Sequence, residues 1–94
     1  MSAESKAWSP IFTPTVRKHL LWWAKQDKKK VNKILDLVEV TCQQPFKGIG
    51  KPEPLKYLDA DIWSRRINLE HRLVYRLAGD CIYFLQCRYH YGDG

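Results

Sequence analysis

The hydrophobic pattern of this sequence changes once along the chain, and that change restricts the fold more than any other feature. Between residues 14 and 44, apolar side chains recur about every 3.6 positions, which is typical of amphipathic helices. From residue 62 onwards, short runs are rich in β-branched and aromatic residues, which is typical of strands. We therefore predict an α+β fold in which two N-terminal helices pack on one face of an antiparallel β-sheet.

Capping residues predict where both helices begin. Thr13 can cap a helix through its hydroxyl, and Pro14 suits the first helical position because an N–H there has no helical partner. Asp27 is the corresponding cap of a second helix, which Pro45 ends. The residues predicted to face the core are Val16, Leu20, Trp23 and Ala24 in the first helix and Val31, Ile34, Leu35, Val38 and Cys42 in the second.

Three strands are predicted at residues 62–69, 72–77 and 81–91, and a short edge strand is predicted at residues 8–12. Tight turns join the three longer strands into an antiparallel meander. The loop at residues 45–61 contains repeated glycine and proline and is longer than most loops of a small domain. It is therefore a candidate functional segment.

The turn between the last two strands decides which side chains share a face of the sheet. A three-residue loop at residues 78–80 keeps the apolar residues of both strands on the core and places Arg72 on the same face as Arg88 and His90. A two-residue turn would flip this register and separate them, so we predict the three-residue loop. The residues of the last strand predicted to face the core are then Cys81, Tyr83, Leu85, Cys87 and Tyr89.

Composition limits the class of protein. The chain has 94 residues, enough for one domain, and a formal net charge of +6. It has no apolar stretch long enough to span a membrane and no apolar run typical of a signal peptide, so a cytoplasmic protein is expected. The three cysteines lack zinc-site spacing and are predicted to be free thiols. The predicted organisation is an N-terminal extension at residues 1–10, a single domain at 11–91 and a short tail at 92–94.

Residues suited to cleaving RNA lie on the polar face of the predicted sheet and on the loop beside it. Cleavage of an RNA phosphodiester needs a base for the 2′-hydroxyl, an acid for the leaving oxygen and cations around the phosphate. Glu53 suits the base, His90 the acid and Arg72 the phosphate. Glu70 is a candidate for raising the pKa of His90 or for orienting an arginine. Since side chains supply all three roles, no metal or other cofactor is expected.

Four ordered motifs along the chain carry a resemblance to a known family. They are PFKGIGKPEPLK at residues 45–56, WSRRI at 63–67, EHRLVY at 70–75 and CRYHY at 87–91. Together they resemble the Txe/YoeB toxins, a group of RelE-like ribonucleases from bacterial toxin–antitoxin pairs. The resemblance implies a small microbial-RNase-like fold and an mRNA interferase that cuts mRNA on the translating ribosome. It also implies a YefM/Axe-like antitoxin that holds the enzyme inactive.

The resemblance further implies roles for individual residues. Glu53 matches the family's proton acceptor, His90 its proton donor and Arg72 its phosphate-binding arginine. Tyr91 matches a tyrosine that positions the substrate, whereas strand alternation places Tyr91 on the face opposite His90. The matching supporting positions are Lys56, Arg66 and Glu70, and the polar face and loop add Lys51 and Arg88 as phosphate-binding candidates.

The distribution of charge predicts further contacts with RNA. Residues 1–47 hold nine Lys and Arg against four Asp and Glu, so the positive charge is concentrated in the helical half. The lysines predicted to dock on ribosomal RNA are Lys28, Lys29, Lys30 and Lys33. Exposed aromatic residues in the helices would permit a homodimer. Two other functions stay open: a non-catalytic basic module that binds RNA or an acidic protein, and a gyrase-poisoning relative of the same fold.

Overall fold

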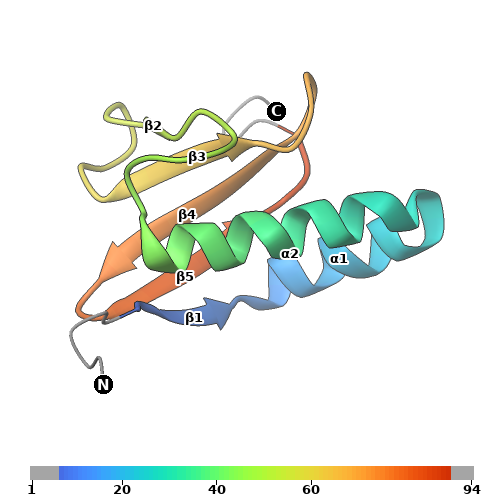
Figure 1. The fold of residues 1–94 in the computed structure, drawn as a ribbon, viewed down its shortest axis with the longest axis horizontal. Coiled ribbons are helices and arrows are strands. Elements are labelled where there is room, and N and C mark those ends of the chain that lie inside the picture. Colours follow the sequence, from blue (N-terminus) through green and yellow to red (C-terminus); the bar gives the residue numbers. More distant parts are fainter. Residues whose placement is uncertain (1–6, 90–94) are drawn as a thin grey trace.

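Two helices cover one face of a five-stranded sheet (Figure 1), which confirms the predicted α+β class. The computed structural model describes residues 7–89. The helices are α1 (Pro14–Gln26) and α2 (Lys28–Gln43). The strands are β1 (Ser9–Phe12), β2 (Glu53–Pro54), β3 (Ile62–Arg66), β4 (Arg72–Ala78) and β5 (Cys81–Gln86), in the spatial order β1-β5-β4-β3-β2. No helix among the described residues is long and apolar enough to cross a membrane.

The sheet combines antiparallel and parallel pairs. Strands β3, β4 and β5 form the predicted antiparallel meander, and β2 adds to β3 in the antiparallel direction. β1 lies at the opposite edge and runs parallel to β5, with Ile11 beside Tyr83. Pro10 lies in β1, where an edge position tolerates a residue that lacks an N–H. The sheet was predicted to be antiparallel, and the observed sheet differs from that prediction in this parallel edge pair.

The predicted caps begin both helices. The hydroxyl of Thr13 accepts a hydrogen bond from the N–H of Val16 at 3.3 Å and donates one to the carbonyl of Phe84 at 2.7 Å, which ties α1 to β5. The carboxylate of Asp27 accepts a hydrogen bond from the N–H of Lys29 at 3.2 Å. These local signals therefore locate both helix starts correctly.

The core lies between the helices and the sheet, and two predicted core positions are exposed instead. The buried residues of α2 are Ile34, Leu37, Val38, Thr41 and Cys42. Ala24 and Leu35 were predicted to face the core but are exposed. Leu37 is fully buried because the loop after α2 also covers this helix, and a Cβ atom on Gly50 would lie 3.1 Å from Cδ2 of Leu37. Contact with both the sheet and the loop shifts the buried face of α2 away from the predicted stripe.

The predicted turn between β4 and β5 is wrong by one residue. The turn contains two residues and pairs Ala78 with Cys81, because Gly79 adopts the positive φ of 63° that such a turn requires. The core-facing residues in the first part of β5 are therefore Ile82 and Phe84, and not Cys81 and Tyr83.

A β-bulge in β5 then returns Cys87 to the face of the sheet that was predicted for it. Tyr75 pairs with Phe84, whereas the neighbouring Val74 pairs with Gln86, so β5 contains one extra residue at this point. Cys87 is fully buried after the bulge, as predicted. The shorter turn and the bulge together replace the single three-residue loop that the apolar pattern suggested.

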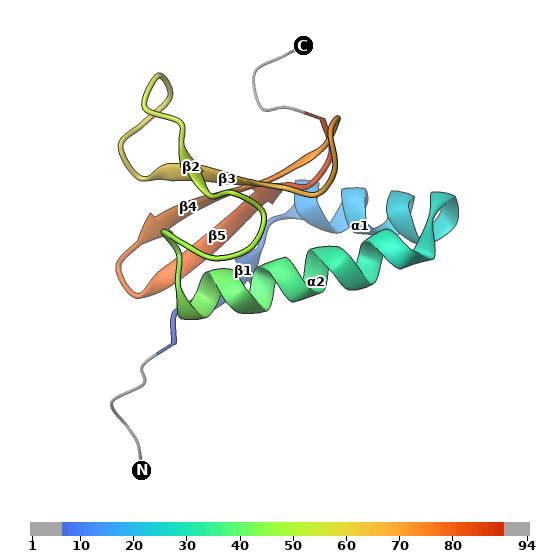
Figure 2. The ribbon, with the colours of Figure 1, turned by 45° about the horizontal axis from the view of Figure 1, so that its top comes forward.

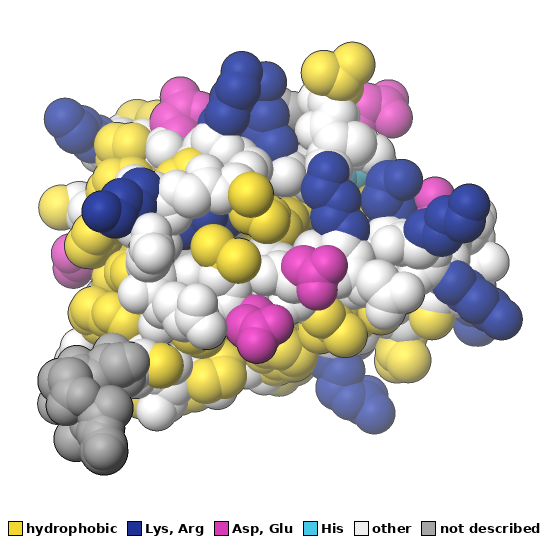
Figure 3. Space-filling view, viewed as in Figure 1, with side chains coloured by type: hydrophobic (Ala, Val, Ile, Leu, Met, Phe, Trp, Pro, Cys, Tyr) yellow, Lys and Arg dark blue, Asp and Glu magenta, His cyan; other side chains and the backbone are white. Residues whose placement is uncertain are grey.

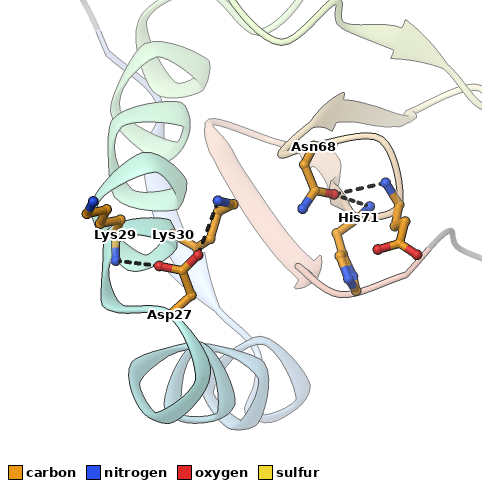
Figure 4. Close-up of polar contacts among 6 residues, drawn as sticks. Asp27, Lys29, Lys30, Asn68 and His71 are labelled. Carbon is orange, nitrogen blue, oxygen red and sulfur yellow. Dashed lines mark hydrogen bonds and ion pairs between the residues drawn. The ribbon is translucent and has the colours of Figure 1, made fainter.

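Two strands end earlier than predicted. β5 stops short of the predicted residue 91, and Tyr89 has a φ of 61°, which is incompatible with a continuing strand. β3 also ends early, because the chain turns at Asn68. The side-chain oxygen of Asn68 closes this turn by accepting hydrogen bonds from the N–H groups of Glu70 and His71 (Figure 4).

The loop from α2 to β2, which Figure 2 shows between the helical layer and the sheet edge, is built around a buried arginine. Arg65 on β3 is fully buried, and its guanidinium donates hydrogen bonds to the carbonyls of Ile49 at 2.7 Å, of Lys47 at 2.9 Å and of Gln44. Carbonyls enclosed in a loop need such donors in place of water. Arg65 therefore anchors the segment that leads into β2.

We expect Gly50→Ala to lower the free energy of unfolding by about 1–3 kcal/mol, because the added Cβ would crowd the loop. Gly50 has a φ of +84°, and its Cβ would lie 3.1 Å from atoms of both Arg65 and Leu37. Gly79→Ala is the matched control, since Gly79 also has a positive φ of +63° but nothing within 4 Å of the added atom. Urea denaturation measures the free energy of unfolding of both variants. Equal losses of this free energy in the two variants would contradict close packing of the loop around Gly50.

Candidate active site

Three neighbouring strands bring a glutamate and an arginine together on one face of the sheet. Glu53 on β2 pairs with Ser64 on β3, and Arg72 begins β4. The Nη1 atom of Arg72 lies 3.4 Å from Oε1 of Glu53 and 3.5 Å from Oγ of Ser64. Arg72 alternates along β4 with the core residue Leu73, so this face is the one opposite the helices. The predicted base and the predicted phosphate-binding arginine therefore meet.

The two side chains differ in how far solvent reaches them. The side chain of Glu53 is 60% exposed, whereas that of Arg72 is 16% exposed. The Nε atom of Arg72 is buried and has no hydrogen-bond partner among residues 7–89. An exposed carboxylate can accept a proton from a substrate, and a guanidinium can bind phosphate through two N–H groups. This Glu53–Arg72 pair therefore offers a base and a cation to a ligand that approaches the exposed Glu53.

Local structure holds Glu53 in position. It lies between two prolines, whose ring-restricted φ angles limit the backbone. Before β2, the N–H of Arg66 donates a hydrogen bond to the carbonyl of Gly50 at 2.6 Å, and after β2 the N–H of Leu55 donates one to the carbonyl of Ile62 at 2.8 Å. The predicted loop thus contains a short strand that was not predicted, because flanking prolines argue against one.

Four of the predicted RNA-binding residues line a cleft that begins next to the pair. Lys30, Lys33, Lys51 and Arg66 contribute to its wall, and its volume is about 480 Å³. Arg66 pairs with Arg72 across β3 and β4, which places the cleft and the pair on adjoining parts of the surface. Figure 4 shows Lys30 between α2 and the turn after β3, and Figure 3 shows Lys and Arg side chains gathered along this part of α2.

The remaining predicted basic and acidic residues lie apart from the pair. Lys28 and Lys29 are exposed at the start of α2, Lys56 is exposed in the turn after β2, and Glu70 is exposed in the turn before β4. No hydrogen bond or ion pair within residues 7–89 joins these side chains to the pair.

Arg88 does not share the face of Arg72, contrary to the prediction. Its guanidinium carbon lies 3.6 Å from the ring centroid of Trp22 on α1 and 4.6 Å from that of Tyr89. The chain has left the sheet at this point, so strand alternation no longer determines where Arg88 points. The arginine instead forms a cation–π stack.

The predicted acid and the predicted tyrosine follow directly after the described range. His90 and Tyr91 lie outside residues 7–89, so their roles stay predictions. The chain just before them is held by the helices, since the indole N–H of Trp23 donates a hydrogen bond to the carbonyl of Cys87 at 2.8 Å.

The cysteines are free thiols, as predicted. Burial raises the pKa of Cys42, and it raises that of Cys87 to about 12. Both buried thiols therefore stay protonated at neutral pH and are poor nucleophiles. In the part of the chain that the structure describes, no three His, Cys, Asp or Glu side chains are grouped so that they could hold a metal ion.

Residues 12–91 match the family described as "YoeB-like toxin of bacterial type II toxin-antitoxin system". The chain belongs to this family. Toxin YoeB from Escherichia coli is 51% identical to it over 71 residues, which are 76% of this chain and 84% of that protein. The chain is therefore a toxin of a type II toxin–antitoxin system.

Solved structures of YoeB-like toxins share the fold. The YoeB/ParE toxin from Agrobacterium tumefaciens superposes with a TM-score of 0.83 at 42% identity, covering 88% of this chain and 99% of that one. A YoeB dimer from Staphylococcus aureus gives a TM-score of 0.81 at 38% identity, covering 90% and 99%. A YoeB–YefM complex from the same organism gives 0.77 at 38% identity, covering 89% and 98%.

Sequence reasoning missed the part that Arg65 plays in this YoeB-like toxin. Strand alternation placed Arg65 on the side of Trp63 and Ile67, and a charged residue in a core-facing series needs internal partners. The glycine-rich loop nearby has carbonyls that need donors. Those two facts together could have predicted the role of Arg65, which holds the loop that leads into β2 and Glu53.

Proposed function

We propose that this toxin is a metal-independent endoribonuclease that cuts mRNA on the ribosome and so inhibits translation. The observation that carries the proposal is the 3.4 Å contact between Glu53, which is exposed, and Arg72 on the sheet face opposite the helices. A proton acceptor beside a phosphate-binding cation is what attack by a ribose hydroxyl on its own phosphate requires. Membership of the YoeB-like toxin family supports the same reaction class.

The proposed reaction is an internal transesterification. Glu53 removes the proton of the 2′-hydroxyl, and the resulting oxygen attacks the adjacent phosphorus. Arg72 stabilises the charge of the phosphorane, exchanging its contact with Glu53 for contacts with the phosphate oxygens. His90 donates a proton to the 5′-oxygen as its bond to phosphorus breaks, and Tyr91 positions the substrate. The products are a 2′,3′-cyclic phosphate and a 5′-hydroxyl.

The basic cleft suits the rest of the nucleic acid. Lys51 and Arg66 lie where they can contact phosphates next to the scissile one, and Lys56 lies just after β2. The lysines proposed to dock on ribosomal RNA are Lys28, Lys29, Lys30 and Lys33. Phosphate contacts of this kind make binding strongly dependent on salt.

Two protein partners are proposed from the structures of relatives. The Staphylococcus aureus toxin is known in a complex with YefM and as a dimer. We infer that a YefM/Axe-like antitoxin covers the Glu53–Arg72 pair, because an arginine-containing surface suits an acidic, largely disordered segment. A homodimer is the second proposed assembly.

We expect His90→Gln to abolish growth arrest in cells that express the chain without an antitoxin. Loss of a general acid lowers a rate by about 10²–10⁴-fold, which is enough to spare most mRNA. Mapping of mRNA 5′ ends after induction would find new ends inside translated codons with the wild type and none with the variant. Lys25→Gln, an exposed change at the end of α1, is the control that keeps both effects.

Two results would contradict this function. Growth arrest by the wild type with DNA-damage markers and no new mRNA ends would indicate a gyrase poison. Growth arrest with neither signal would indicate a non-catalytic module that blocks its target by binding.

A further inference from the structure

The three residues after β5 leave the sheet, yet side chains from α1, from β5 and from the turn before β4 hold their backbone. The N–H of Cys87 donates a hydrogen bond to Nδ1 of His19 on α1 at 3.1 Å, and the carbonyl of Cys87 accepts one from the indole of Trp23 at 2.8 Å. The carbonyl of Arg88 accepts one from the amide of Gln86 at 2.9 Å. This segment, residues 87–89, is therefore ordered by side chains in place of a strand partner.

A second histidine holds the end of the segment. The N–H of Tyr89 donates a hydrogen bond to Nδ1 of His71 at 2.7 Å, and the carbonyl of Tyr89 accepts one from the N–H of Arg72 at 3.2 Å. Tyr89 has a φ of 61°, a backbone conformation that persists only where its surroundings impose it. Arg72 is also the residue that contacts Glu53, so this backbone hydrogen bond joins the segment to the Glu53–Arg72 pair.

Both histidines must be neutral to make these bonds. A backbone N–H can only donate, so Nδ1 of His19 and of His71 must carry a lone pair, and the ring proton lies on Nε2. Protonation of either imidazole would turn the acceptor into a donor and break its hydrogen bond to the segment.

The surroundings of His19 favour its neutral form. Burial, the positive charge of Arg88 and the proximity of His71 together lower the pKa of His19 from its ordinary value of 6.5. The neighbouring Cys87 thiol stays protonated and adds no charge. Because the pKa is lowered in the folded chain, the stabilisation from neutral His19 is complete above pH 6.5 and is lost as the pH falls below that value.

We propose that His19 and His71 are positioning residues: as neutral acceptors they fix residues 87–89, the backbone that continues directly into His90, the proposed acid. The inference rests on the proposed function of His90 as the general acid. It goes beyond that function because it assigns a role to two residues that take no part in the reaction as proposed. It also makes cleavage depend on the protonation state of His19.

The test compares two replacements of similar size at each histidine. Asn places its side-chain oxygen where Nδ1 lies and can accept the same hydrogen bond, whereas Leu cannot. In cleavage of mRNA on purified ribosomes, we expect His19→Leu and His71→Leu each to lower kcat by about 10- to 100-fold with KM unchanged, since small misplacements of a catalytic group have effects of this size. His19→Asn and His71→Asn should retain most of the wild-type kcat. Gln26→Leu, an exposed change on α1, is the control.

The pH profile supplies a readout that a merely structural role would not change. The wild type should lose activity at a pH below 6.5, as the pH falls through the lowered pKa of His19. The double variant His19→Asn/His71→Asn cannot be protonated at these positions, so its activity should persist to lower pH. Equal kcat values for the Leu and Asn variants, or an unchanged acid limit in the double variant, would overturn the proposal.

A measurement without RNA separates this inference from the proposed function. Long-range ¹H–¹⁵N spectra of the wild type should find both histidines as the Nε2–H tautomer at pH 7.5. Exchange of the Cys87 and Tyr89 amides should be at least about 10-fold faster in the Leu variants than in the Asn variants. If these results are obtained while the wild type fails to cut mRNA, the proposed function is wrong, but the hydrogen bonds that His19 and His71 accept from the segment are confirmed. If the Nδ1–H tautomer is found, the positioning role is overturned whatever the activity.

Discussion

Replacing Glu53 by Gln is expected to lower the rate of mRNA cleavage by about 10²–10⁴-fold, the range typical of a lost general base. The amide has the same shape as the carboxylate but cannot take a proton from the 2′-hydroxyl. Glu53 is 60% exposed and its ion pair with Arg72 lies at the surface, so the free energy of unfolding should change by less than about 1 kcal/mol. Single-turnover cleavage on ribosomes and urea denaturation of the same variant measure the two effects separately.

The matched control is Glu39→Gln, which removes an exposed carboxylate from α2. It should leave the cleavage rate unchanged. Binding of RNA by Glu53→Gln should be at least as tight as that of the wild type, because Arg72 is released from its carboxylate partner. If Glu53→Gln cleaved mRNA at the wild-type rate, Glu53 could not be the base, and the proposed reaction would be wrong.

Replacing Arg65 by Met is expected to lower the free energy of unfolding by about 3 kcal/mol. Arg65 is fully buried, and its loss leaves the carbonyls of Gln44, Lys47 and Ile49 without their donor. Since small domains have a total stability of about 5–15 kcal/mol, this is a large fraction. Cleavage should also fall, because the same loop positions β2 and Glu53.

The control for this change is Arg76→Met on the neighbouring strand. Arg76 is exposed on β4, so its replacement should alter the free energy of unfolding by about 0.5 kcal/mol or less. Urea denaturation of both variants provides the comparison. A loss as small for Arg65 as for Arg76 would mean that the loop does not depend on the buried guanidinium.

The helices and the strands of the meander could be predicted from sequence because their signals are local. A capping threonine or aspartate acts on an N–H two or three residues away, as Thr13 and Asp27 do here. The candidate pair could also be predicted in part. Strand alternation placed Arg72 on the polar face and Glu53 was predicted on the loop beside it, and the structure brings them to 3.4 Å.

The exact register could not be predicted, because two alternatives satisfy the same local pattern. A three-residue loop keeps the apolar residues aligned, but the chain instead uses a two-residue turn at Gly79 and a bulge in β5 between Phe84 and Gln86. The two features together place Cys87 in the core as one longer loop would have done. A pattern with a period of two residues cannot distinguish them.

By itself, then, the sequence determined the element types, the helix caps, the concentration of basic residues and the four motifs that mark a YoeB-like toxin. Only the tertiary structure decided that Arg65 is buried under the glycine-rich loop, that Arg88 stacks on Trp22, and that His19 and His71 hold the chain after β5. The physical reason is the range of the interactions. Caps and periodicity join near neighbours, whereas these contacts join residues from 16 to 68 positions apart in the chain and exist only once the helices pack on the sheet.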